Sequence, residues 1–160
     1  MAEIKKTNAA RFLDTLKLPY ALTSYSVDEE DLSATHAAEM LGVAPECVFK
    51  TLLARSDTNV IVVACIPADA HIDLKALARV AKMKRVELVA VKELLGLSGY
   101  IRGGCSPLAM KKRFATFVDE SVLTLDLVYV SAGMRGLQLH LAPKDLIKAC
   151  NASCTSLVKV

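Results

Sequence analysis

Hydrophobic positions along this chain follow two repeats, one typical of helices and one typical of strands. Apolar residues three or four apart predict helices that begin after the N-cap residues Thr7, Ser33 and Asp73, and a last helix at 143–150. Apolar or alternating runs predict strands at 22–27, 48–55, 60–66, 85–90, 115–119, 127–131, 137–141 and 156–160. Short helical segments are expected at 92–95 and 107–113, on either side of a loop at 96–106.

Two pairs of these strands are separated only by turn-forming residues, which predicts hairpins. Residues 56–59 link one pair, and residues 132–136 link the other. No repeat, linker or low-complexity segment divides the chain, so we expect a single domain over residues 1–160. Hairpins interspersed with helices indicate a compact α/β fold of the α+β type, with a mixed, largely antiparallel sheet.

The composition indicates a folded protein with a large core and gives no sign of a membrane protein. Hydrophobic residues make up 53% of the 160 residues, and charged residues make up 23%. The longest apolar run, 60–66, is far shorter than the roughly 20 residues that a spanning helix needs. The N-terminal segment lacks the apolar stretch of a secretory signal, so we expect a cytoplasmic protein with reduced cysteines.

Charge and metal-ligating residues narrow the function classes further. The five cysteines and three histidines show no metal-ligand spacing, so we expect neither a metal nor a cofactor. The net charge of +3 excludes a highly charged nucleic-acid binder but allows a protein that contacts a few phosphates. Two short basic clusters either contact nucleic acid or complement helix ends: Lys82, Lys84 and Arg85, and Lys111, Lys112 and Arg113.

Lys50 interrupts an otherwise apolar strand face. The alternation of a strand places it on the side shared by Val48 and Leu52. One interpretation is an edge-strand lysine that discourages pairing with another sheet. The other is a cation directed into a pocket, where it would meet a phosphate, a carboxylate or a polarised carbonyl.

The loop Gly103-Gly104-Cys105-Ser106-Pro107 is the second candidate for chemistry. Paired glycines allow a close approach of the backbone to a ligand, and Ser106-Pro107 is typical of a helix start. The loop is therefore either a tight structural turn or a cradle of N–H groups for an oxyanion or phosphate. The turn that contains Ser131, Gly133 and Arg135 is a weaker candidate, because an ordinary hairpin loop has the same composition.

Taken in order, three segments of the chain resemble the YbaK/EbsC family, which is related to the editing domain of bacterial-type prolyl-tRNA synthetases. They are Val48-Phe49-Lys50-Thr51-Leu52, then Gly99-Tyr100 with Gly103-Gly104-Cys105-Ser106-Pro107-Leu108, and Tyr129 to Leu137, which reads YVSAGMRGL. The resemblance spans most of the chain, from about residue 8 to residue 157. It implies a compact α/β domain with a mixed sheet and a pocket lined by these three segments.

The resemblance also implies a function, a trans-editing deacylase that hydrolyses mischarged aminoacyl-tRNA, with cysteinyl-tRNA(Pro) as the expected substrate. It gives Lys50 the role of the functional lysine and Tyr25 that of a pocket tyrosine. It assigns substrate binding to Gly103, Gly104 and Ser106 and to the turn residues Ser131 and Gly133. In such a mechanism the substrate's own thiol attacks its carbonyl, which agrees with the absence of a recognisable catalytic triad.

Three alternatives stay open on the sequence. The chain is a cysteine editor, an editor of alanyl-tRNA(Pro) from the same superfamily, or a non-catalytic module that binds tRNA or a synthetase. The expected partners are aminoacyl-tRNA and, for the choice of tRNA, prolyl-tRNA synthetase. With a small net charge the protein contacts few phosphates, and phosphate contacts carry no sequence information. We therefore expect the synthetase to select the tRNA.

Overall fold

The computed structural model describes residues 5–160. Residues 1–4 lie outside the described residues. The predicted domain begins there, and so does the N-terminal segment that lacks the features of an export signal. The helices are α1 (Asn8–Thr15), α2 (Ala34–Leu41), α3 (Leu74–Val80), α4 (Val91–Ser98) and α5 (Pro143–Cys150), with short 3-10 helices η1 (Pro45–Cys47) and η2 (Glu120–Thr124). The strands are β1 (Ala21–Ser24), β2 (Phe49–Ser56), β3 (Ile61–Pro67), β4 (Val86–Leu88), β5 (Ala115–Asp119), β6 (Val128–Met134), β7 (Leu137–Leu141) and β8 (Ser153–Thr155).

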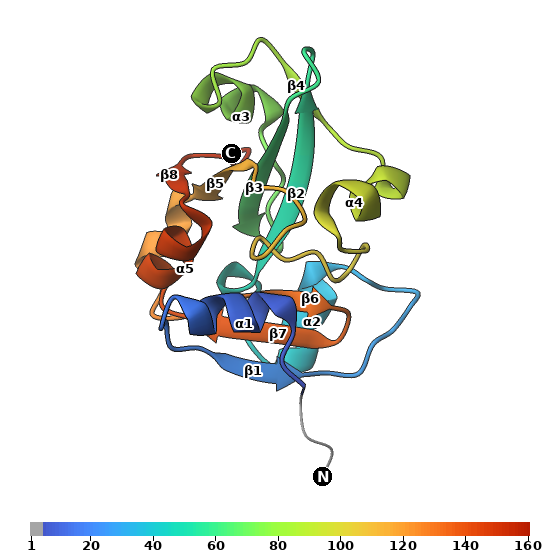
Figure 1. The fold of residues 1–160 in the computed structure, drawn as a ribbon, viewed down its shortest axis with the longest axis vertical. Helices are drawn as coiled ribbons and strands as arrows, with labels where there is room; N and C mark the ends of the chain where they lie inside the picture. Colours follow the sequence, from blue (N-terminus) through green and yellow to red (C-terminus); the bar gives the residue numbers. More distant parts are fainter. Residues whose placement is uncertain (1–4) are drawn as a thin grey trace.

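The strands form two sheets, which lie one above the other in Figure 1. The larger has the order β4-β2-β3-β5-β8, with antiparallel pairs at β2 and parallel pairs at β5. The smaller has the order β1-β7-β6 and is antiparallel throughout. A single bridge between Val48 and Tyr129 links them. The predicted mixed, mostly antiparallel pairing and both hairpins are confirmed, but the strands divide between two sheets instead of one.

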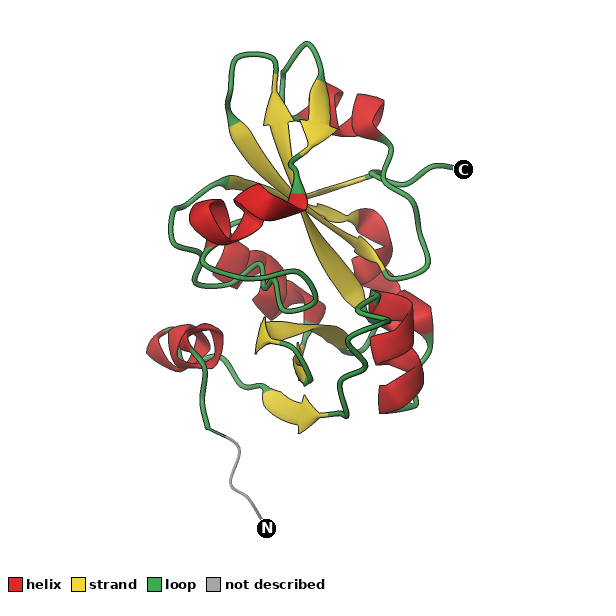
Figure 2. Cartoon of the chain, turned by 90° about the vertical axis from the view of Figure 1, so that its right-hand side faces the viewer, coloured by secondary structure: helices red, strands yellow, loops and turns green. Residues whose placement is uncertain are grey.

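The larger sheet is covered on both faces, and this explains the apolar run of its central strand. Figure 2 shows helices on both sides of this sheet. Val62, Ala64 and Ile66 of β3 pack in one cluster with Leu77 of α3. The alternate residues Val63 and Cys65 pack in the main cluster, which also contains Leu139 of β7 and Leu146 of α5. The main core therefore joins the two sheets, and every residue from Val62 to Ile66 is buried.

The predicted helix starts are confirmed because side chains satisfy the first free N–H groups. The side chains of Thr7, Ser33 and Asp73 accept hydrogen bonds from the first turns of α1, α2 and α3. Gly42 ends α2 in the left-handed conformation, with φ of 70°. Within residues 5–160 no helix has the length and apolar character that crossing a membrane requires.

The predicted helical segment at 107–113 is wrong. These residues form bends without helical structure, and Ala109 has φ of 55°, which a right-handed helix does not accommodate. Ser106 does not cap a helix, because its hydroxyl accepts a hydrogen bond from Leu108 N at 3.2 Å in a tight turn. The predicted anion site at a helix end is therefore absent from this loop.

Several element ends also differ from the prediction. Strand β1 ends at Ser24, while α4 is longer than expected and continues to Ser98. Strand β6 runs on through a bulge between Ser131 and Met134, which leaves a short turn before β7. The last strand lies at Ser153–Thr155, and only an isolated bridge to Ile72 involves the predicted segment at 156–160.

Candidate functional site

A pocket of about 380 Å³ opens beside the first half of β2, where that strand has no second neighbour. Its walls come from α2, from the start of α4 and the segment before it, from the glycine loop and from the small sheet. Four predicted site residues line it, namely Tyr25, Lys50, Gly103 and Ser131. Segments far apart in the sequence therefore meet at one cavity, within the size range of small-molecule sites.

Lys50 is half-buried and extends along the wall of this pocket. Its Nζ donates a hydrogen bond to the backbone oxygen of Ala68 at 3.0 Å, and Ala68 also lines the cavity. Partial burial lowers the pKa of Lys50, while the carboxylate of Asp69 acts in the opposite direction. Since one carbonyl occupies only one of its three N–H groups, the ammonium can also bind an incoming anion or carbonyl oxygen.

The glycine loop packs directly against the turn of the second hairpin. A Cβ atom on Gly104 would lie 3.0 Å from the backbone of Met134 and Arg135, so no larger residue fits there without displacement. Gly103 has φ of 86°, and Arg135 Nε donates to the backbone oxygen of Arg102 at 2.8 Å. These contacts fix the edge of the pocket at Gly103.

The turn residues Ser131 and Gly133 and the neighbouring Tyr25 are held by further contacts of the same hairpin. The hydroxyl of Ser131 accepts the N–H of Gly133 at 3.1 Å, and Gly133 has φ of 104°. A Cβ atom there would approach the ring of Tyr100 to 2.9 Å. The N–H of Tyr25 donates to the carbonyl of Gly136 at 2.9 Å, which places Tyr25 at the pocket.

Not every predicted site residue reaches the cavity. Gly104 and Gly133 lie behind its wall, and Ser106 is fully buried away from it. The N–H of Gly104 donates to the carbonyl of Ile101 at 3.0 Å and is not free to bind substrate. The amides available from this loop are those of Gly103 and Cys105, which line the pocket and form no backbone hydrogen bond within residues 5–160.

Sequence reasoning missed Arg102 and Gln138 as pocket residues. Arg102 precedes the glycine pair and adds a second cation. Gln138 lies opposite Ser131 in the β6–β7 register, and its Oε1 is buried without a partner among the described residues. Proximity to the glycines could have indicated Arg102, but only strand register places Gln138 at the pocket.

The pocket contains no group suited to act as a strong base or nucleophile. None of its lining residues is a histidine, aspartate or glutamate. Burial raises the pKa of the Cys105 thiol to about 11, so only roughly one thiol in ten thousand is ionised at pH 7. Within residues 5–160 no group of His, Cys, Asp and Glu side chains is arranged to hold a metal ion. The site can bind and position a polar ligand, with cations and amides near an apolar wall.

The comparisons with known proteins support the family resemblance of the three segments that contribute to the pocket. The family described as "Aminoacyl-tRNA editing domain" matches residues 28–149. A protein of Enterococcus faecalis, named "Putative Cys-tRNA(Pro)/Cys-tRNA(Cys) deacylase EbsC", is 42% identical over 147 residues, which cover 92% of this chain and 90% of that protein. The chain belongs to the aminoacyl-tRNA editing domain family. The family resemblance found in the sequence is thus confirmed.

Solved structures share the fold of this family member over nearly its whole length. The crystal structure of the hypothetical protein APE2540 matches with a TM-score of 0.87 at 23% identity and covers 96% of this chain and 100% of that one. A structure described as "a putative trans-editing enzyme for prolyl tRNA synthetase" matches with a TM-score of 0.80 at 18% identity, over 98% and 100% of the two chains. The arrangement of two sheets and their helices is therefore common to these proteins.

Proposed function

We propose that this protein hydrolyses the ester bond of mischarged aminoacyl-tRNA, with cysteinyl-tRNA(Pro) as its substrate. The observation that carries the proposal is the composition of the pocket at β2, where Lys50, Arg102 and free amides adjoin an apolar wall without any strong base. An aminoacyl ester is already activated, so positioning and charge stabilisation supply much of the acceleration. The name of the EbsC relative, 42% identical to this chain, supports the same reaction class.

In the proposed reaction the nucleophile belongs to the substrate. The cysteine thiol forms a bond from its sulfur to its own ester carbonyl carbon, and the carbon–oxygen bond to the terminal ribose breaks. The thiol proton passes to the departing ribose oxygen, and the resulting four-membered thiolactone is later opened by water. This step needs no protein base, in keeping with the absence of His, Asp and Glu from the pocket wall.

The residues of the pocket hold the ester and stabilise the charge that develops on its carbonyl oxygen. The N–H groups of Gly103 and Cys105 are the available backbone donors for that oxygen. The ammonium of Lys50 holds the ester or the terminal phosphate beside them. Correctly charged prolyl-tRNA lacks a thiol and is spared for that reason.

The choice among tRNAs requires a partner in this proposal. The pocket is large enough for an amino acid and part of its ribose, and nothing in it reads the body of a tRNA. We propose that prolyl-tRNA synthetase supplies that selection in the cytoplasm, where the substrate is formed. The isolated protein should then hydrolyse cysteine from tRNA(Pro) and tRNA(Cys) at similar rates, and the synthetase should favour tRNA(Pro). Strong discrimination by the isolated protein would remove the need for a partner.

The direct test is a deacylation assay with preformed cysteinyl-, alanyl- and prolyl-tRNA(Pro). We expect rapid release of cysteine and retention of alanine and proline. Rapid release of alanine would assign the protein to the alanine-editing alternative. Retention of all three amino acids, with measurable tRNA binding, would identify a non-catalytic module.

A further inference from the structure

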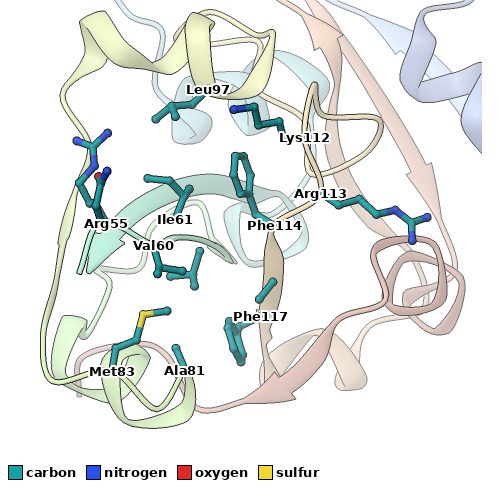
Figure 3. Close-up of a pocket in the computed structure, with 13 residues that line it drawn as sticks. Arg55, Val60, Ile61, Ala81, Met83, Leu97, Lys112, Arg113, Phe114 and Phe117 are labelled. Carbon is teal, nitrogen blue, oxygen red and sulfur yellow. The ribbon is translucent and has the colours of Figure 1, made fainter. Parts of the chain in front are cut away.

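A second, larger hollow of about 500 Å³ lies at the other end of the larger sheet, where β3 and β5 begin. We call it the basic cleft and define it by Arg55, Val60, Met83, Lys112, Arg113 and Phe114. Figure 3 shows Leu97 and Lys112 on one wall, Met83 and Ala81 on the opposite wall, and Ile61 and Phe114 between them. The cleft is therefore a trough with an apolar floor and cationic ends.

One basic cluster lines the cleft, and the second cluster flanks a residue of the opposite wall in the sequence. Lys112 and Arg113 line it from one side, and Met83, which lies between the exposed Lys82 and Lys84, lines it from the other. None of these four cations forms an ion pair with another residue in the range 5–160. Of the four, Lys112 and Arg113 line the cleft, so their charges are available to a ligand there, whereas Lys84 lines a separate hollow.

Arg55 has a different role, because it is already paired. Its two terminal nitrogens bind the carboxylate of Glu93 at 3.0 and 2.9 Å, which ties β2 to α4 at one end of the cleft. No acidic residue lines the cleft itself. Charge complementarity therefore selects an anionic ligand, which Lys112 and Arg113 can bind at the rim of the cleft.

The apolar floor indicates what the ligand presents between its charges. Val60 is 46% exposed and Phe114 is half-buried, so an uncovered aliphatic and aromatic surface lies beside the cations of the cleft. A nucleotide combines these features, since its phosphate seeks cations and its base or ribose stacks on an aromatic ring. Helix α4 links the two sites, because it contributes Leu94 to the first pocket and Leu97, one turn later, to the cleft.

We infer that the basic cleft binds the phosphodiester backbone of the tRNA substrate, next to the pocket that receives its aminoacyl end. The inference rests on the proposed function and adds a second contact region to it. Contacts of Lys112 and Arg113 with phosphates hold the RNA without reading its sequence. Phe114 provides a surface for one nucleoside.

The test measures binding of uncharged tRNA(Pro) by the full-length parent protein and by two double variants, each of which has lost two positive charges. Lys112→Gln with Arg113→Gln changes the cleft, and the matched control, Lys5→Gln with Lys17→Gln, changes exposed lysines on either side of α1. We expect the cleft variant to lose at least fivefold in affinity at about 50 mM salt. For the parent, the slope of log affinity against log salt concentration should be roughly −2 to −3. For the cleft variant that slope should be shallower by about 1.5. The control should keep the parent slope within about 0.3.

A short substrate separates failure of this inference from failure of the proposed function. Cysteine esterified to a terminal CCA trinucleotide reaches the first pocket only, so the cleft variant should hydrolyse it at the parent rate. If the parent protein does not hydrolyse this ester, the proposed function fails while the binding result still stands. Equal tRNA affinity and salt slope in the cleft variant and the control would overturn the inference. If that variant then lost association with prolyl-tRNA synthetase, the cleft would be a protein-docking surface.

Discussion

At the scale of single residues, the proposed chemistry depends most on the ammonium of Lys50. Lys50→Met retains the aliphatic stem against the strand and removes the ammonium that donates to Ala68 at the pocket wall. We expect deacylation of cysteinyl-tRNA(Pro) to fall by more than about thirtyfold, equivalent to about 2 kcal/mol of lost transition-state stabilisation. Lys144→Met, on an exposed position of α5, is the control and should retain the parent rate. A Lys50→Met rate within about threefold of the parent would contradict the assignment.

Cys105, in contrast to Lys50, should be dispensable for deacylation. The residue lines the pocket, but burial keeps its thiol protonated at neutral pH, so its side chain is a poor nucleophile. Cys105→Ser preserves the backbone amide and should deacylate within about threefold of the parent rate. A Cys105→Ser variant without turnover, in a protein with an unchanged melting temperature, would indicate a covalent intermediate on the enzyme.

At the scale of elements, the contact between the glycine loop and the second hairpin is the feature most sensitive to volume. Gly104→Ala places a Cβ atom 3.0 Å from the backbone of Met134 and Arg135. We expect a loss of about 1–3 kcal/mol in the free energy of unfolding and a reduced deacylation rate, because Gly103 moves with the loop. Gly96→Ala is the matched control, since no atom lies within 4 Å of its Cβ and it sits inside α4. The free energy of unfolding of that variant, measured by urea denaturation, should be about 0.5–1 kcal/mol higher than that of the parent. Equal stabilities of the two variants would show that the loop is not held by the hairpin.

The elements themselves were largely predictable from the sequence, because local rules decide them. Capping by Thr7, Ser33 and Asp73 and the apolar run of β3 are determined by neighbouring residues. The helix predicted at 107–113 failed because Ser106 and Tyr100 bind the backbone of Leu108 instead. Likewise, the position of Gln138 in the pocket wall and that of Lys112 and Arg113 across the cleft from Met83 depend on long-range packing, which no local pattern encodes.

At the scale of the whole molecule, buried thiols make stability dependent on pH. Burial raises the pKa of Cys105 to about 11 and of Cys150 to about 12, and it raises that of Cys65 well above its ordinary value. These groups are protonated in the folded state at pH 10, whereas unfolded thiols ionise near pH 9. The unfolded state therefore binds fewer protons, so the stabilisation present below pH 9 is lost as the pH rises toward the folded pKa values.

We expect the free energy of unfolding to fall by about 4 kcal/mol between pH 8 and pH 10, roughly 1.3 kcal/mol for each of the three thiols, measured by urea denaturation under reducing conditions. The lowered pKa of Lys50 acts against this trend but belongs to a single, only half-buried group. Cys150→Ser should show a decrease smaller by about 1 kcal/mol. Identical pH profiles for the parent and the variant would contradict the role assigned to this thiol.

In the proposed mechanism, the pocket beside β2 accelerates a reaction in which the substrate supplies the nucleophile. The most direct measurement is the rate of deacylation of cysteinyl-tRNA(Pro) and seryl-tRNA(Pro) by the same preparation, with the uncatalysed rates subtracted. Serine has the same shape and replaces the thiol by a hydroxyl, so both esters fit the pocket. We predict that cysteine is released at least about a hundredfold faster than serine, which corresponds to about 2.7 kcal/mol. Rates equal within a few-fold for the two esters would contradict the account, because the enzyme would then have to provide the attacking group or activate water.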